Sequence, residues 1–238
     1  MTKPCARDKL NVHYDAMWDG AIGAIAKSDI DCDTRLAAGP DPRRGLTLIA
    51  RPCQRVRERL DTLLDRLAGA EPGQYRYPAS DMHVTILSLF TATERFATEL
   101  ARLAQYRAAM SAALDGIESF EIEFDGITLS RGAVVACGFP RSAVLETLRQ
   151  RLREQLRARG LDTSLDQRYR LVTAHATLFR FIAPLRDPAG FAALLADLRQ
   201  APLGTTRVDQ VELVVNDWYM SATSLQRVAI VPLPTSGA

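Results

Sequence analysis

The residues His83-Val84-Thr85-Ile86 recur later in the chain as His175-Ala176-Thr177-Leu178. Each stretch has a histidine, a variable residue, a threonine and an aliphatic residue, and each lies in an apolar run typical of a buried strand. Two of the three histidines of the chain occupy this repeated setting. The repeat predicts a domain with two similar halves, each of which contributes one such strand.

The histidine and the threonine of each stretch are expected to share one face of their strand. Side chains two residues apart on a strand point the same way, so His83 accompanies Thr85 and His175 accompanies Thr177. Histidine exchanges protons near neutrality because its usual pKa is about 6.5, and a threonine hydroxyl can donate to a phosphate oxygen. Two such pairs that face each other across a phosphodiester supply a general base, a general acid and two phosphate ligands.

The hydrophobic pattern around these stretches predicts a mixed α and β domain. Strand patterns cover 46–50, 82–90, 120–125, 133–139, 170–182, 211–215 and 227–233, and helical spacing covers 53–68, 94–114, 144–156 and 191–198. The order of strand, helix, motif strand and helix occurs twice along the chain. Five arginines around the third helix are interpreted as a solvated polar face, with contact to RNA as the alternative: Arg149, Arg151, Arg153, Arg157 and Arg159.

Residues 1–45 lie outside the repeated order and are predicted to form a partly helical extension of a domain at 46–238. Asp29, Asp31 and Asp33 alternate in this extension, which suggests a calcium loop. Such a loop requires glycine at its sixth position and glutamate at its twelfth, and both are missing here. We therefore interpret the three aspartates as part of a solvated loop.

Composition sets further limits. The formal net charge is only +2, with 30 basic and 28 acidic residues, which gives no sign of extensive non-specific binding to nucleic acid. The four cysteines form no C-x-x-C pair, so we expect free thiols and a cytoplasmic location. No apolar run is long enough for a transmembrane helix, and no membrane or obligate protein partner is indicated. His13, the third histidine, has no repeated neighbourhood and is not assigned to the site.

From Gly45 to Leu233 the chain resembles the 2H phosphoesterase superfamily, which is named for two H-x-T/S-x motifs. The resemblance implies an α+β fold with two pseudo-symmetric lobes, each an antiparallel sheet with helices outside, around a central cleft. It implies His83 and His175 as catalytic residues and Thr85 and Thr177 as phosphate ligands. The family commonly has proline before the second histidine, where this chain has Ala174.

The resemblance implies a metal-independent phosphoesterase that needs no cofactor. Its expected partners are RNA ends or nucleotides that carry a 2′,3′-cyclic phosphate or a 2′-5′ linkage, and reversal of the reaction to ligation is open. One alternative is a phosphodiesterase for small molecules such as ADP-ribose 1″,2″-cyclic phosphate. The other is a nucleotide-binding or RNA-binding module without turnover. Two histidines with no cysteine or H-x-x-x-H partner make a poor zinc site.

Four more residues are candidates for substrate contacts: Tyr75, Tyr77, Phe179 and Arg180. A tyrosine ring can stack on a base, or it can pin its loop to the core. Strand alternation puts Phe179 on the His175 face, with a role in the core as the alternative. The same alternation puts Arg180 on the opposite face, so its contact with a phosphate requires a twist or a bulge. Trp218 and Tyr219 are candidates for the rim of the site.

Overall fold

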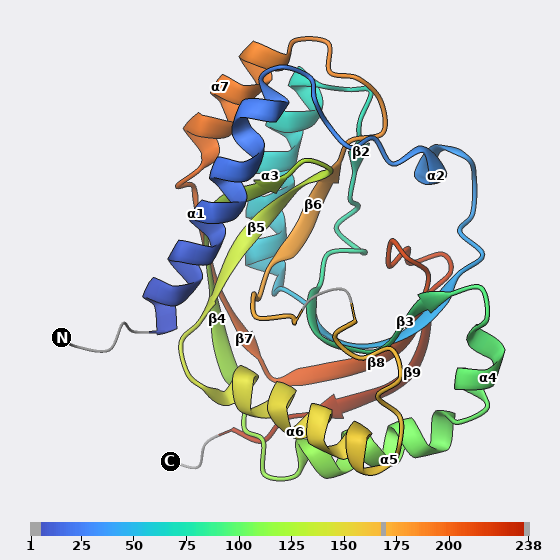
Figure 1. The fold of residues 1–238 in the computed structure, drawn as a ribbon. Helices are drawn as coiled ribbons and strands as arrows, with labels where there is room; N and C mark the ends of the chain where they lie inside the picture. Colours follow the sequence, from blue (N-terminus) through green and yellow to red (C-terminus); the bar gives the residue numbers. More distant parts are fainter. Residues whose placement is uncertain (1–5, 168–169, 236–238) are drawn as a thin grey trace.

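Two antiparallel β-sheets form the centre of the computed structural model, which describes residues 6–167 and 170–235 (Figure 1). The first sheet has the order β3-β1-β8-β9 and the second has the order β2-β6-β5-β4-β7. The strands of the first sheet are β1 (Arg44–Ala50), β3 (Val84–Thr93), β8 (Gln210–Asn216) and β9 (Gln226–Pro232). The strands of the second are β2 (Tyr75–Arg76), β4 (Phe120–Ser130), β5 (Ala133–Pro140), β6 (Ala176–Arg180) and β7 (Pro202–Val208).

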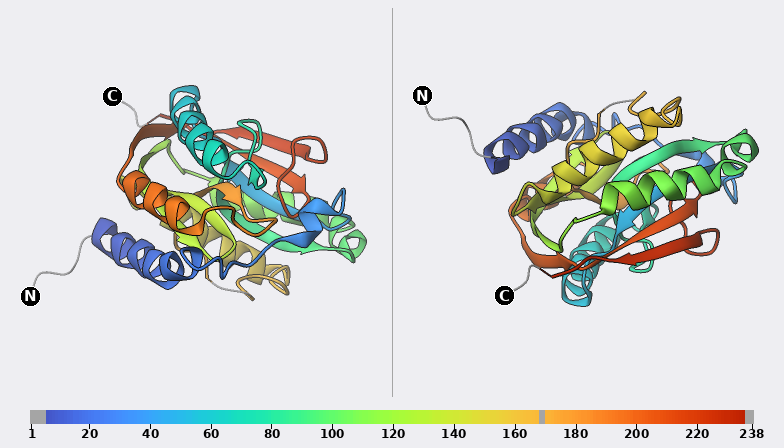
Figure 2. Two further views of the ribbon diagram at one scale, coloured as in Figure 1. Left: turned by 90° about the horizontal axis from the view of Figure 1, so that it is seen from above. Right: turned by 90° about the horizontal axis from the view of Figure 1, so that it is seen from below.

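Seven helices in the described part of the chain surround the sheets. They are α1 (Ala6–Ile25), α2 (Thr34–Ala37), α3 (Gln54–Ala70), α4 (Phe96–Leu100), α5 (Leu103–Leu114), α6 (Val144–Ala158) and α7 (Pro188–Leu198). Helices α3 and α7 pack on the second sheet, while α5 and α6 lie side by side and α6 packs on β3 (Figure 2). No helix of this described part is long and apolar enough to cross a membrane.

The two sheets repeat one arrangement. In the first sheet the chain leaves β1, passes through α3 and returns as β3 beside β1; in the second it leaves β5, passes through α6 and returns as β6 beside β5. Each of these helices packs on the sheet of the other half, α3 on β6 and β7 and α6 on β3. The prediction of two antiparallel sheets with outer helices is therefore confirmed.

Three local predictions differ from the structure. The predicted helix 94–114 is divided into α4 and α5. The motif strands begin later than predicted, so that each motif histidine immediately precedes its strand. Strand β7 was not predicted, because its central residues Gly204-Thr205-Thr206-Arg207 show no apolar alternation; the backbone of β7 pairs with β4 from Phe120 opposite Val208 to Asp125 opposite Pro202.

Helix α1 and the chain that follows it pack closely on the second sheet. The Tyr14 hydroxyl donates to the Gly138 carbonyl on β5 at 3.0 Å, and the Thr128 hydroxyl on β4 donates to the Tyr14 carbonyl at 2.7 Å. From α1 the chain passes α2 and reaches β1 of the first sheet (Figure 1). The residues before β1 therefore connect both sheets, and the division at residue 45 stays a prediction.

Candidate active site

Each motif strand contains a β-bulge at the fourth residue of its motif. Strand β3 sets Thr85 opposite Ile49 and Leu87 opposite Leu48, so Ile86 is the extra residue. Strand β6 sets Thr177 opposite Val135 and Phe179 opposite Val134, which makes Leu178 the extra residue. A bulge of this kind shifts the alternation of all later side chains on its strand.

The bulge in β6 moves Arg180 to the face of Thr177. Arg180 lies opposite Ala133 and Thr177 lies opposite Val135, and these two residues of β5 are two positions apart. Because residues paired across antiparallel strands point to the same face, Arg180 and Thr177 share that face. The sequence alternation predicted the reverse, since the sequence did not reveal where the bulge lies.

The same shift corrects the prediction for Phe179. Its side chain is fully buried and packs against the rings of Phe181 and Phe191, with centroids 6.3 Å and 6.0 Å away. Phe179 is therefore a core residue and cannot reach a substrate. Tyr77 is also buried, and its hydroxyl accepts a hydrogen bond from Nε of Arg180 at 2.8 Å, so its contact with the site passes through Arg180. Tyr75 stays partly exposed, edge-on to Tyr77.

The two histidines are partly exposed, and a hydrogen bond at Nδ1 fixes each ring. Nδ1 of His83 donates to the Asp81 carbonyl oxygen at 2.7 Å. A carbonyl only accepts, so the neutral ring carries its proton on Nδ1 and leaves the Nε2 lone pair free. Nδ1 of His175 lies 2.7 Å from the Thr173 hydroxyl, which is able to donate or accept. Thr85 and Thr177 are partly exposed as well.

Burial and neighbouring charges lower the pKa of both motif histidines. Burial lowers the pKa of His83 to about 4, and the charges of Arg51 and Arg180 act in the same direction. Burial also lowers the pKa of His175 to about 4, and His83, Arg149, His13 and Arg180 lower it further. Among the groups that act on His175, His83 has the largest influence, as expected if the two motifs lie near each other. Both imidazoles are neutral at pH 7.

Arg149 of α6 connects the two motif segments through hydrogen bonds to their backbone carbonyls. Its side chain is 1% exposed, and its guanidinium donates to four backbone carbonyls. The acceptors in β3 are Thr85 at 2.9 Å and Ile86 at 2.8 Å; those before β6 are Val172 at 3.2 Å and Thr173 at 2.7 Å. One cation thus fixes the bulge beside His83 and the segment that carries His175.

The interpretation of Arg149 and Arg153 as solvated residues is wrong. Arg153 is fully buried, and it pairs with Asp166 at 2.7 Å and donates to the Leu171 carbonyl at 3.3 Å. Both arginines lie within the apolar stripe of α6 that contains Leu145, Leu148, Leu152 and Leu156. Their position inside that stripe was a signal in the sequence for buried arginines with specific partners.

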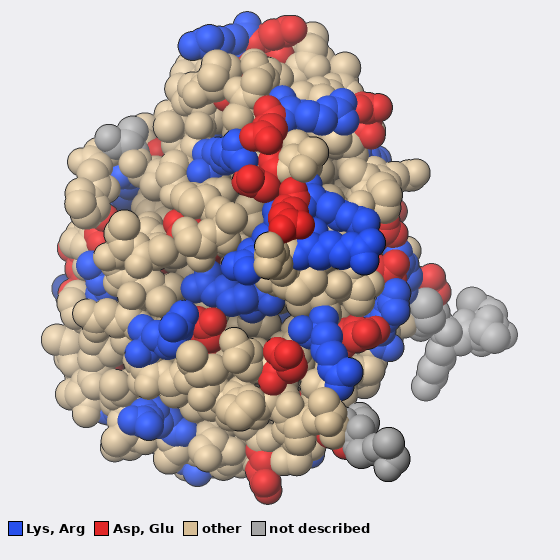
Figure 3. All heavy atoms as spheres, turned by 180° about the vertical axis from the view of Figure 1, so that it is seen from behind, with Lys and Arg blue, Asp and Glu red and all other residues tan. Residues whose placement is uncertain are grey.

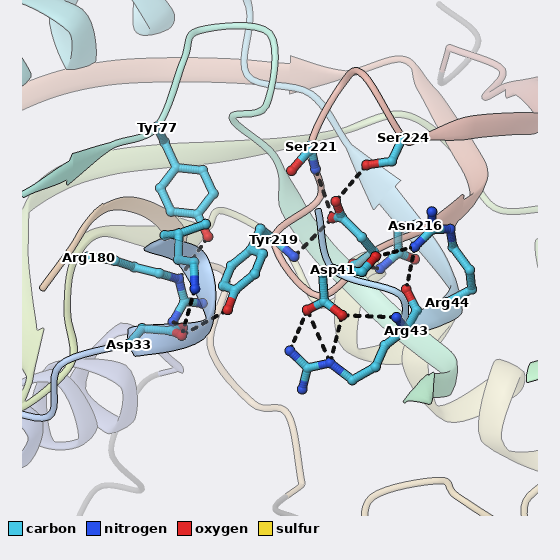
Figure 4. A network of polar contacts seen from close by, with 12 residues as sticks. Asp33, Asp41, Arg43, Arg44, Tyr77, Arg180, Asn216, Tyr219, Ser221 and Ser224 are labelled. Atoms are coloured by element: carbon cyan, nitrogen blue, oxygen red, sulfur yellow. Dashed lines mark hydrogen bonds and ion pairs between the residues drawn. The ribbon is translucent and has the colours of Figure 1, made fainter. Parts of the chain in front are cut away.

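A second network, before β1 and after β8, adjoins Arg180 (Figure 4). The guanidinium carbon of Arg180 lies 5.9 Å from the Tyr77 ring centroid and 5.6 Å from that of Tyr219. The Tyr219 hydroxyl donates to Asp33 at 2.8 Å, and Nη1 of Arg180 is 3.9 Å from the other Asp33 oxygen. The interpretation of Asp33 as part of a solvated loop is therefore wrong, because its carboxylate has specific partners far along the chain that nothing in its neighbourhood indicates.

A glycine lets the second motif pass close to its neighbouring strand. A Cβ atom at Gly138 would lie 1.9 Å from the Ala174 carbonyl oxygen, immediately before His175. Any side chain at Gly138 would therefore displace the backbone of the motif. Among the described residues, no group of three or more His, Cys, Asp or Glu side chains is arranged to hold a metal ion.

Comparisons with known proteins agree with this fold. The family model of the 2′-5′ RNA ligase superfamily matches residues 49–220. The solved structure of TT0787 from Thermus thermophilus has a TM-score of 0.60 at 16% identity, with 82% of this chain and 100% of that chain covered. E. coli LigT in complex with 3′-AMP has a TM-score of 0.52 at 15% identity, with 81% and 99% covered. No curated protein sequence matches significantly. The chain therefore belongs to the 2′-5′ RNA ligase superfamily of 2H phosphoesterases.

Proposed function

We propose that the protein hydrolyses 2′,3′-cyclic phosphates or 2′-5′ phosphodiester bonds at RNA ends or in nucleotides, with His83 and His175 as the acid–base pair. The observation that carries this proposal is that one buried arginine, Arg149, donates to the backbone of both motif segments, at the Thr85 and Thr173 carbonyls, so that the two histidine–threonine pairs lie in neighbouring segments of the two sheets. Phosphoryl transfer requires a proton acceptor for the attacking oxygen, a proton donor for the leaving oxygen and positive groups around the phosphate.

The tautomers support a division of roles between the histidines. Neutral His83 has a free Nε2 lone pair, because its Nδ1 proton is held by the Asp81 carbonyl. It is therefore suited to remove a proton from water. His175 is then the acid, and its imidazolium form can donate from Nδ1 to the Thr173 hydroxyl. A bound phosphodiester anion raises the pKa of an adjacent histidine, which would protonate His175 when the substrate arrives.

Threonine and arginine side chains are assigned to the phosphate oxygens. Thr85 and Thr177 follow the two histidines on the faces that the bulges define, and the bulge brings Arg180 to the face of Thr177. Arg180 keeps 23% of its side chain exposed, so part of its guanidinium remains accessible to a ligand. Imidazoles move the protons and these groups bind the anion, so the proposed reaction needs no metal ion.

The small net charge favours a short substrate over a long polyanion. Basic side chains gather near the middle of the face in Figure 3, but acidic side chains interrupt them. The net charge of +2 agrees with this mixture. The LigT structure contains 3′-AMP, and we extend nucleotide binding from that relative to this chain as part of the proposal. Free thiols at Cys32, Cys53 and Cys137 support the proposed cytoplasmic location.

The test is hydrolysis of 2′,3′-cyclic nucleotides in the presence of EDTA. Wild type should turn over the substrate, and His83→Ala and His175→Ala should each lose roughly 10²–10⁴-fold in kcat/KM, the usual contribution of a general acid or base. His13→Ala is the matched control, because His13 is exposed on α1 and influences His175 less than His83 does, so the rate should change far less than in either motif variant. Product analysis by phosphorus NMR would identify the oxygen that leaves.

Two results would contradict the proposal. Activity that disappears with EDTA and returns with zinc would replace the two-histidine mechanism with metal catalysis. Tight nucleotide binding by wild type without turnover of cyclic nucleotides or 2′-5′-linked dinucleotides would indicate a binding module instead. ADP-ribose 1″,2″-cyclic phosphate belongs in the same assay, because preferred turnover of that compound would assign a small-molecule substrate.

A further inference from the structure

Asp33 is held rigidly beside the arginine that the proposed function assigns to the phosphate. Its backbone N–H donates to the carbonyl of Phe181, the residue after β6, at 2.8 Å. Its carboxylate caps α2 by accepting from the Leu36 N–H at 3.4 Å, and it accepts from the Tyr219 hydroxyl at 2.8 Å. These three contacts come from different parts of the chain, so they fix the position of the carboxylate independently of Arg180.

The remaining Asp33 oxygen lies 3.9 Å from Nη1 of Arg180 (Figure 4). Both side chains are partly exposed, Asp33 by 21% and Arg180 by 23%, so the pair borders solvent. Tyr219 remains a phenol that donates to Asp33, because burial and this hydrogen bond raise its pKa. The contact between Asp33 and Arg180 is an ion pair.

Asp33 lies before the region that the family model matches, which begins at residue 49. The segment before that region thus places the Asp33 carboxylate beside Arg180. That charge acts differently on the two sides of the proposed reaction. A phosphodiester carries one negative charge, whereas a phosphomonoester carries nearly two above its second pKa of about 6. A fixed carboxylate repels the monoester more strongly.

We propose that Asp33 is a specificity residue that makes the site select monoanionic phosphodiesters over dianionic phosphomonoesters. The carboxylate offsets part of the Arg180 charge, so the remaining attraction suits a ligand with a single negative charge. A hydrolysis product with a terminal monoester is then released more readily, and phosphomonoester ends are poor competitors. The inference rests on the proposed function to the extent that Arg180 contacts the phosphate.

A pair of ligands that differ by one charge tests this selection without turnover. 2′-Deoxyadenosine 3′-monophosphate and its methyl ester share the base and the sugar, and neither has the 2′-hydroxyl needed for cyclisation. Their dissociation constants would be measured by calorimetry at pH 7.5 for wild type and Asp33→Asn. Asparagine is an equally good N-cap and still accepts from Tyr219, so this variant removes the charge and keeps the fold.

Asp33→Asn should strengthen binding of the monoester relative to its methyl ester by at least roughly five-fold, the effect of one unit charge about 4 Å away at the dielectric constant of water. The control is Asp31→Asn, because Asp31 is exposed and pairs with Arg131 at 3.4 Å; it should leave the ratio unchanged. An unchanged ratio in Asp33→Asn would overturn the inference. So would an equal shift in Asp31→Asn, or a wild type that binds neither ligand.

These outcomes are independent of the proposed catalysis. If wild type binds both ligands and Asp33→Asn shifts their ratio, the charge selection stands even when no cyclic nucleotide is hydrolysed. If hydrolysis occurs and the ratio does not shift, the proposed function stands and Asp33 has only a structural role. An equal loss of affinity for both ligands in Asp33→Asn would also show that Asp33 supports the structure of the site and does not select by charge.

Discussion

The first motif strand, β3, and the second, β6, carry the same pattern and the same bulge, but they differ in what surrounds the histidine. Nδ1 of His83 is held by a backbone carbonyl, whereas Nδ1 of His175 is held by a hydroxyl. A carbonyl permits one neutral tautomer and a hydroxyl permits two. The difference teaches that a symmetric framework can position two chemically unequal histidines, which an acid–base pair requires.

The position five residues after each histidine also differs. In β3 it is Ser88, and in β6 it is Arg180. The bulges put both on the face of their motif threonine, because Ser88 lies opposite Thr47 and Thr85 lies opposite Ile49. Only the second half therefore contributes a cation from this position, and the phosphate should lie closer to the second sheet.

The largest expected effect comes from removal of the arginine that joins the halves. Arg149→Met keeps the length of the buried side chain but leaves four carbonyls without their donor. A buried acceptor without a partner costs about 1–3 kcal/mol, so we expect the free energy of unfolding to fall by at least about 3 kcal/mol. Urea denaturation followed by circular dichroism measures this loss.

The other crossover helix supplies the control for Arg149. Arg59 is the sixth residue of α3, as Arg149 is of α6, but Arg59 is exposed. Arg59→Met should change stability by less than about 0.5 kcal/mol, as is usual for surface substitutions. Similar losses in the two variants would show that Arg149 does not join the motifs in the way the hydrogen bonds indicate.

The sequence predicted the parts of the site that follow from the repeated motif and the hydrophobic periods. It missed those that depend on how the strands pair, residue by residue. Both histidine–threonine pairs were evident from the repeat, and most strands and helices from their hydrophobic periods. The bulges at Ile86 and Leu178 were not, since one extra residue leaves no mark on composition. For that reason Phe179 was assigned to the wrong face. Asp33 could not be found, because its contacts with Phe181 and Tyr219 depend on the tertiary fold.

The next comparison is between Arg180 and Ser88. Arg180→Ala removes the cation proposed to stabilise the phosphate, and kcat/KM should fall roughly 100-fold, in line with loss of one donor to a developing anion. Ser88→Ala at the equivalent position should have little effect, because the Ser88 hydroxyl already donates to the Phe90 carbonyl at 3.1 Å. Steady-state kinetics on 2′,3′-cyclic AMP would decide. Equal losses would mean that the phosphate lies midway between the sheets.

The threonines should give smaller and more nearly equal effects. Thr85→Val and Thr177→Val each keep the shape of the side chain and remove one proposed donor to the phosphate. A hydrogen bond to a charged group contributes about 1.5–3 kcal/mol, so kcat/KM should decrease at least about 10-fold in each variant. A loss in only one of them would show that only one half of the symmetric framework binds the phosphate.

The smallest expected effect is the response of stability to acid. Both histidines have a pKa of about 4 in the folded chain, against about 6.5 when unfolded. Between these values the unfolded chain binds more protons, so stability is full above pH 6.5 and decreases as the pH falls toward 4. After allowance for partial exposure, the pair should account for roughly 1 kcal/mol per pH unit.

A variant with both histidines replaced isolates this response. His83→Gln combined with His175→Gln removes both titrating groups, so the urea midpoint should fall less between pH 7 and pH 4.5 than it does for wild type. Because the two pKa values are alike, each single variant should recover about half of the difference. If the double variant were as sensitive to acid as wild type, burial would not hold these imidazoles neutral, and the free base that the proposed mechanism requires at pH 7 would have to come from another group.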